Sequence, residues 1–341
     1  MICICDQSSI YKVPIELQNQ GLVKYFFEKF GIQSKTEKDA LKKSLLYKWH
    51  RLADQSDELS KSVSIALVGK YTKLEDAYTS VIKALQHSAL AINRRLNLVY
   101  IEGTDLEEKM KVQNQKAYHA AWTQLCDANG IIVPGGFGDR GVEGKILAIQ
   151  HAREKKIPFL GICLGYQCAV IEIARNVLGW NDAETAEGNK DTKNLVIVEM
   201  PEHHGGDLGG TMRVGQRPTN FVNSDCILYK LYGCKETIYE RHRHRYEVNP
   251  DVVPELEKAG MLFVGRDTTD KRMEIMELQD HPYFVGVQFH PEYTSRPLKP
   301  SPPYLGLLKA SIGKLNRSTV LTDFIVSSDT ESLDSNELFQ V

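Results

Sequence analysis

The sequence has 341 residues, with 42 basic and 44 acidic side chains and a formal net charge of −2. This length can bury one large core or two modest ones, and the near-neutral charge gives no electrostatic reason to expect nucleic acid or an anionic membrane. No apolar run approaches the roughly 18 residues of a membrane span, and the first residues do not resemble a signal peptide. We therefore predict a cytoplasmic protein whose ligand is small, with neither nucleic acid nor membrane as a partner.

The first two segments of the chain differ from the rest of the sequence. Residues 1–34 begin with a short apolar stretch and continue with helix-like spacing broken at Gly21, which is typical of the end of another domain. Residues 35–61 are highly charged, and their apolar positions recur on one helical face, at Leu41, Leu45, Leu46 and Trp49. We predict a linker helix here that packs onto a neighbour.

Residues 62–315 form the predicted catalytic domain. Strand-like and helix-like segments alternate, with strands expected at 63–69, 97–102, 131–135 and 158–162, and helices near 75–95, 114–126, 141–155 and 165–178. Shorter strands follow at 195–200, 237–240, 262–265, 272–278 and 283–289. The pattern predicts an α/β fold: an open, mainly parallel twisted sheet with helices on both faces plus added antiparallel strands.

The C-terminal segment 316–341 is acidic, rich in serine and poor in large apolar residues. Such a composition cannot bury enough apolar surface to fold, so we predict a disordered tail. From residue 327 onward its serines stand beside acidic residues, which makes the tail a candidate for phosphorylation.

A candidate nucleophile comes directly after the strand at 158–162. The run Gly161-Ile162-Cys163-Leu164-Gly165 leads directly into an amphipathic helix, and glycines on both sides of a residue permit a tight strand-to-helix turn. A helix N-terminus and a nearby imidazole would both favour the thiolate. Taken alone, Cys163 is equally well explained as a small buried hydrophobic residue, and for Cys168 we favour that structural interpretation.

A candidate base and its orienting group lie at the end of a later apolar strand. His290 and Glu292 are two residues apart, and in extended backbone such residues point to the same side. Glu292 would then hold one ring nitrogen while the other faces sulfur, with Pro291 stiffening the turn. A lone histidine after a strand is usually structural. The combination of this motif with the cysteine turn favours a catalytic triad of Cys163, His290 and Glu292.

The segment Val133-Pro134-Gly135-Gly136-Phe137-Gly138 supplies candidate oxyanion donors. The backbone amides of Gly136 and Leu164 could hold the negative oxygen of a tetrahedral intermediate, although a simple glycine turn also explains the segment. A phosphate-binding loop is excluded, because the spacing from Gly138 to Gly144-Lys145 is one residue too long and Ile146 replaces the hydroxyl residue.

Other charged residues give weaker signals. A free amino-acid substrate needs partners for its carboxylate and its ammonium, and Arg245 and Glu187 are plausible without being singled out. The clustered histidines at 203–204 and 242–244 have arginine neighbours or lack ligand spacing, and the odd number of cysteines, seven, shows no framework. We predict neither a metal site nor a disulfide scaffold.

These motifs resemble the class-I glutamine amidotransferases, and more specifically the glutaminase domain of CTP synthase. The resemblance is carried by VPGGFGDRG, GICLGYQ, GGTMRVG, ERHRHRYEVNP, QFHPEYTSRP and PSPPYLG. It implies hydrolysis of L-glutamine without a cofactor, and it implies a set of substrate-binding residues: Gly136, Leu164, Gly165, Tyr166, Gln167, Glu187 and Arg245. It also implies that the stretch around 209–213 is a mobile lid linked to activation by GTP.

The resemblance extends to residues 1–34, which look like the end of the synthase domain of CTP synthases. The rest of that domain is not in this sequence, and the family's ATP, Mg²⁺ and UTP chemistry belongs to it. The resemblance therefore predicts ammonia production, with CTP formation requiring the other domain. Two alternatives stay open. The first is an enzyme of another amidotransferase branch or a hydrolase of γ-glutamyl substrates, which RHRHRYEVN disfavours. The second is a low-activity regulatory or assembly fragment that joins full-length CTP synthase subunits in the family's tetramers or filaments.

Overall fold

The computed structural model describes residues 2–32, 45–72, 74–200 and 212–315. Part of the predicted linker, most of the predicted lid and the whole predicted tail with its candidate phosphorylation sites lie outside the described residues. Within the described part of the chain, no helix is long and apolar enough to cross a membrane.

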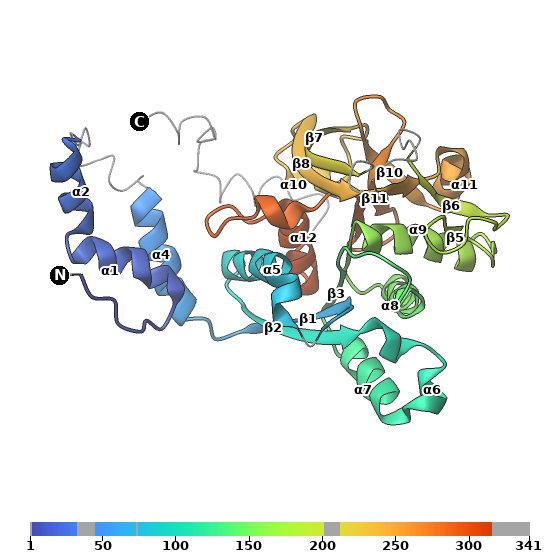
Figure 1. Ribbon diagram of the computed structural model, residues 1–341, viewed down its shortest axis with the longest axis horizontal. Helices are drawn as coiled ribbons and strands as arrows, with labels where there is room; N and C mark the ends of the chain where they lie inside the picture. The colour runs from blue at the N-terminus through green and yellow to red at the C-terminus, as the bar shows by residue number, and fades with distance from the viewer. Residues whose placement is uncertain (1, 33–44, 73, 201–211, 316–341) are drawn as a thin grey trace.

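The N-terminal helices form a separate group at one end of the molecule (Figure 1). They are α1 (Val13–Asn19), α2 (Leu22–Phe30) and α4 (Leu45–Asp57). Trp49 of α4 packs edge-on against Tyr11, with ring centroids 5.9 Å apart, and its indole N–H donates to the Tyr11 carbonyl at 2.7 Å. The predicted linker helix therefore does pack onto a neighbour, and part of that neighbour is the N-terminal segment. The domain boundaries themselves stay predictions.

A nine-stranded sheet forms the centre of the fold, in the order β2-β1-β3-β4-β12-β11-β10-β7-β8. The first five strands are parallel: β2 (Arg95–Glu102), β1 (Ser62–Gly69), β3 (Gly130–Val133), β4 (Phe159–Ile162) and β12 (Phe284–Val287). The other four are antiparallel: β11 (Met273–Leu278), β10 (Met261–Arg266), β7 (Arg213–Phe221) and β8 (Thr237–His244). A small second sheet contains β5 (Glu184–Thr185), β6 (Leu195–Glu199) and β9 (Tyr246–Val248).

Helices cover both faces of the main sheet, as predicted. Along β1, Ile65 and Leu67 join one buried cluster, while Ala66 and Val68 join another, because successive side chains of a strand point to opposite faces. Helices α5 (Thr79–Ala91), α10 (Ile227–Leu231) and α12 (Pro302–Ser311) contribute to the first cluster. Helices α7 (Gln115–Cys126), α8 (Val142–Lys155), α9 (Leu164–Asn176) and α11 (Val253–Lys258) contribute to the second.

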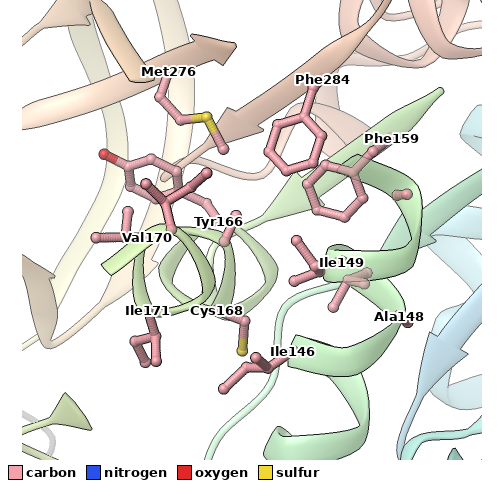
Figure 2. Close-up of a cluster of buried hydrophobic side chains, with 14 of the residues drawn as sticks. Ile146, Ala148, Ile149, Phe159, Tyr166, Cys168, Val170, Ile171, Met276 and Phe284 are labelled. Carbon is pink, nitrogen blue, oxygen red and sulfur yellow. The ribbon is translucent and has the colours of Figure 1, made fainter. Parts of the chain in front are cut away.

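The core around α9 is aromatic and closely packed (Figure 2). The rings of Phe159 and Phe284, on neighbouring strands, have centroids 4.6 Å apart. Cys168 lies in this cluster with no exposed surface, and burial raises the pKa of its thiol to about 11. The structural interpretation of Cys168 agrees with this placement.

Two predicted elements differ in detail, and other elements were not predicted. The helix expected near 75–95 is divided into a short 3₁₀ turn (Glu75–Tyr78) and α5, and the strand expected at 237–240 continues to His244. Strand β7 and the short helix α6 (Met110–Gln113) were not predicted. Along β8, burial alternates, so its histidines point inward and its arginines outward.

Candidate active site

The predicted strand-to-helix turn at Cys163 is present between β4 and α9. Cys163 has φ 51° and ψ −103°, a backbone conformation that only the surrounding packing can hold. A Cβ added at Gly161 would lie 2.7 Å from the carbonyl oxygen of Gly165, and one added at Gly165 would lie 2.0 Å from that of Val133. Both flanking glycines are therefore required for the turn to form.

The structure brings His290 and Glu292 together beside the cysteine. His290 Nδ1 lies 2.8 Å from Glu292 Oε1, and the Tyr304 hydroxyl donates to the other carboxylate oxygen at 3.4 Å. Burial lowers the pKa of His290, but its hydrogen bonds and charge interactions with Cys163 and Glu292 outweigh burial and raise that pKa to about 11. The site thus favours the imidazolium form of His290.

The extended backbone that was predicted between His290 and Glu292 is wrong. The backbone after His290 is not extended, because Pro291–Thr294 form a 3₁₀ turn for which His290 is the N-cap. The side chains meet because the chain turns back on itself, with the His290 amide anchored to the Arg241 carbonyl at 2.7 Å. The contact was anticipated correctly, and the backbone conformation was not.

The glycine segment after β3 forms one wall of the site and is held from two sides. The Lys70 ammonium donates to the carbonyl oxygens of Phe137 and Gly138 at 2.5 and 2.7 Å. The Gly138 amide donates to Glu187 Oε1 at 2.9 Å. Lys70 was not anticipated from the sequence, since a single lysine after a strand is usually solvated. Leu164 is the first residue of α9, so helical hydrogen bonding cannot use its backbone N–H.

A cavity of about 250 Å³ opens at this wall. Four residues of predicted importance line it: Cys163, His290, Glu292 and Gly136. Pro134, Gly135 and Phe137, from the predicted glycine segment, also line it. The sequence did not point to the other lining residues: Ala77, Tyr78, Ser80, Val81, Arg243 and Tyr293. The sequence did contain a signal for Arg243. Arginines alternate with histidines from Arg241 to Arg245, and Arg243 lies two residues before the predicted substrate residue Arg245.

The predicted substrate residues occupy different positions around the cavity. The Arg243 and Arg245 guanidinium carbons each lie 6.0 Å from the centre of the Phe137 ring, which lines the cavity. Glu187 and Arg245 are thus placed beside the glycine segment and are not part of the cavity lining itself. Gly165 is buried under the turn, where a side chain has no room.

Tyr166 and Gln167 direct their side chains into the protein. The Tyr166 ring is fully buried within the cluster of Figure 2. Its hydroxyl donates to the Met273 carbonyl at 2.8 Å. Gln167 Nε2 donates to the Tyr246 carbonyl at 2.9 Å and to Gln288 Oε1 at 3.1 Å. Any contact that Tyr166 makes with a ligand must therefore use its backbone.

The family described as glutamine amidotransferase class-I matches residues 73–310. The chain therefore belongs to the class-I glutamine amidotransferase family. Among solved structures, the Trypanosoma brucei CTPS glutaminase domain with bound acivicin is similar to it, with a TM-score of 0.68 and 38% sequence identity, covering 75% of this chain and 96% of that one.

Within this family, the chain is similar to CTP synthases. It is 58% identical over 316 residues to Xenopus laevis CTP synthase 2, which covers 93% of this chain and 54% of the relative. It is 54% identical over 316 residues to Homo sapiens CTP synthase 1, covering 93% of this chain and 53% of the relative. The chain spans about half the length of these curated relatives.

Proposed function

We propose that this chain hydrolyses the side-chain amide of L-glutamine to glutamate and ammonia, using Cys163, His290 and Glu292 as a catalytic triad. The observation that carries the proposal is the cavity lined by all three residues, in which a partly buried histidine is hydrogen-bonded to a buried carboxylate beside a cysteine in a strained turn. A small amino acid fits the size of this cavity, and the step needs no cofactor.

In the proposed reaction, the Cys163 thiolate attacks the amide carbon of glutamine, and the carbonyl oxygen becomes an oxyanion. Imidazolium His290 gives its proton to the amide nitrogen, the carbon–nitrogen bond breaks, and ammonia leaves a γ-glutamyl thioester on sulfur. Neutral His290 then takes a proton from water, which attacks the thioester. The carbon–sulfur bond breaks, glutamate leaves and the thiolate returns. Glu292 keeps the ring oriented and stabilises its charged form.

The backbone amides of Gly136 and Leu164 are the proposed oxyanion donors. Each such donor stabilises the transition state by about 3 kcal/mol in comparable enzymes. The Lys70 contacts with the Phe137 and Gly138 carbonyls support this role, because they hold the glycine segment in place before substrate arrives. The turn from Leu164 to Gln167 would line the other side of the substrate.

The proposed clamp for the free ends of glutamine consists of Arg245 for the carboxylate and Glu187 for the ammonium. Glu187 already accepts a hydrogen bond from Gly138 through one oxygen, so it would link the ammonium to the oxyanion segment. Discrimination against glutamate follows, because a second carboxylate at the reacting end would meet the thiolate instead of a neutral amide.

The ammonia is proposed to serve ATP-dependent amination of UTP to CTP, because the similar proteins are named CTP synthases. That reaction would need ATP and Mg²⁺. It would also need the part of those relatives that this chain does not match. Activation by GTP is a further proposal from the same resemblance.

A second candidate function is assembly with full-length CTP synthase subunits. Helix α2 exposes Tyr25, Phe26 and Phe30, and the last two rings stack with centroids 5.9 Å apart. An exposed aromatic face of this kind favours a contact with another protein surface. Co-purification of this chain with a full-length subunit, and its loss in a variant with polar residues at these positions, would support assembly.

Ammonia release from glutamine by the purified chain tests the glutaminase proposal, measured with and without GTP. We expect turnover that is abolished in Cys163→Ala. Equal release by the variant would exclude Cys163 as the nucleophile, and no release by either protein under any condition would favour the assembly function.

A further inference from the structure

Three buried polar side chains, Gln288, Gln167 and His244, form a connected layer, and one of them, Gln288, reaches the Cys163 sulfur. Gln288, directly after β12, places its Nε2 3.6 Å from Sγ and has only 1% of its surface exposed. Gln167 of α9 contacts Gln288, and His244 of β8 reaches the same backbone carbonyl as Gln167. None of these contacts is needed to form the triad, so the layer calls for its own explanation.

The direction of each hydrogen bond in this layer follows from one backbone carbonyl. The Tyr246 oxygen can only accept, so the Gln167 atom 2.9 Å from it must be the amide nitrogen. The same nitrogen lies 3.1 Å from Gln288, which must therefore present its oxygen there. Consequently the amide nitrogen of Gln288 faces the sulfur, and the contact is an N–H donated to Cys163.

The inward-pointing histidines of β8 reinforce this orientation. His244 Nδ1 lies 3.0 Å from the Tyr246 carbonyl and must donate to it, which leaves its Nε2 to accept from His242 Nδ1 at 3.1 Å. Burial lowers the pKa of both rings, to about 2 for His242 and about 3 for His244. Both rings are therefore neutral near pH 7, and they fix the carbonyl without adding charge beside the thiolate.

We propose that Gln288 is a further catalytic residue, which donates a hydrogen bond to the Cys163 sulfur and stabilises its thiolate, with Gln167 as the positioning residue that aims it. The proposal rests on the proposed role of Cys163 as nucleophile. In the thiol form, Sγ lies 3.8 Å from the Arg243 carbonyl, to which it can donate. Once the sulfur is ionised that interaction is lost, and the Gln288 donor remains.

A neutral amide suits this task because it cannot transfer its proton to sulfur. His290 therefore stays the group that exchanges protons with the leaving ammonia, while Gln288 stabilises charge in every step in which the sulfur is anionic. Hydrogen bonds to charged groups are stronger than those between neutral groups, and burial of the donor preserves that strength.

The test measures the reactivity of the thiol itself, without glutamine. Iodoacetamide alkylation of Cys163 is followed across pH in the wild-type chain, Gln288→Met and Gln288→Glu, with peptide fragmentation separating Cys163 from Cys168. Methionine keeps the volume and removes the donor. We expect the pH at half-maximal alkylation rate to rise by about one unit in Gln288→Met. The rise should be larger in Gln288→Glu, because a carboxylate repels the thiolate.

Ser88→Ala is the matched control, since Ser88 on α5 is also fully buried and its hydroxyl donates to the Ala84 carbonyl of its own helix. Its alkylation midpoint should equal that of the wild type. Should the Gln288 variants fail to fold by circular dichroism, Gln167→Met replaces them, and it should shift the midpoint in the same direction because Gln288 loses its anchor.

An unchanged midpoint in a folded Gln288→Met chain would overturn the assignment. This result is distinguishable from failure of the proposed function. Full glutaminase activity in Cys163→Ala would overturn the nucleophile, whereas an inactive Cys163→Ala together with an unchanged Gln288→Met midpoint would overturn only the role of Gln288.

Discussion

Gly135→Ala should disable the site without unfolding the protein. The added Cβ would lie 2.7 Å from His290 Cε1 and 3.4 Å from the Cβ of Cys163. An ordinary carbon–carbon contact is about 3.5 Å, so the imidazole must move by roughly 0.8 Å. The ring is free to move only by lengthening its 2.8 Å contact with Glu292 or by leaving the sulfur. Misplacement of about 1 Å can lower a rate by about 10²-fold, equivalent to about 2.7 kcal/mol of barrier.

The assay compares kcat for ammonia release with the midpoint of thermal unfolding. Gly306→Ala on α12 is the control, because its Cβ would lie 2.6 Å from the Tyr283 ring, a similar overlap outside the cavity. We expect Gly306→Ala to lower the unfolding midpoint and keep kcat, and Gly135→Ala to show the opposite pattern. If Gly135→Ala kept kcat within about twofold of wild type, the inferred proximity of Gly135, His290 and Cys163 would be wrong.

Three other outcomes are expected. Cys163→Ala should abolish ammonia release while the buried Cys168→Ala leaves the chemistry nearly unchanged, and a comparable loss in both would show that the wrong thiol was chosen. The chain should form no CTP from UTP and ATP even with added ammonium, as checked by chromatography; CTP formed free of contaminating full-length enzyme would refute this. Burial raises the pKa of Glu240 from 4.5 to about 7, so its stabilising contribution is fully present below about pH 4.5 and lost as pH rises through 7. Glu240→Gln should therefore flatten the fall of the thermal midpoint between about pH 5 and 8, and parallel curves would contradict it.

The parallel half of the fold was predictable because each strand is a short apolar run followed by an amphipathic helix. Strand β7 was not, because its sequence is polar and contains Gly215 and Pro218, which argue against a strand interior. The structure accommodates both residues near the edge of the sheet, where β7 pairs with the edge strand β8. Tertiary pairing overrides local propensity there.

The candidate triad was predictable from two local motifs, but its assembly depends on a long-range pairing. Strands β4 and β12 lie side by side in parallel, with Ile162 opposite Val287, so the turn at Cys163 and the turn at His290 leave the same edge of the sheet. Sequence spacing could not show this adjacency. Nor could it show Lys70 or Gln288, because a polar side chain reveals its partner only when the fold supplies one.

The most direct measurement is peptide mass spectrometry of the chain after rapid acid quenching during turnover of glutamine. We predict a γ-glutamyl group in thioester linkage on Cys163, formed only in the presence of substrate and absent from His290→Ala if proton transfer to the leaving ammonia is lost. Two results would contradict the proposed role of Cys163. One is ammonia release with the glutamyl group on Cys168. The other is ammonia release with no covalent intermediate on Cys163 under conditions in which hydrolysis of the thioester is slowed.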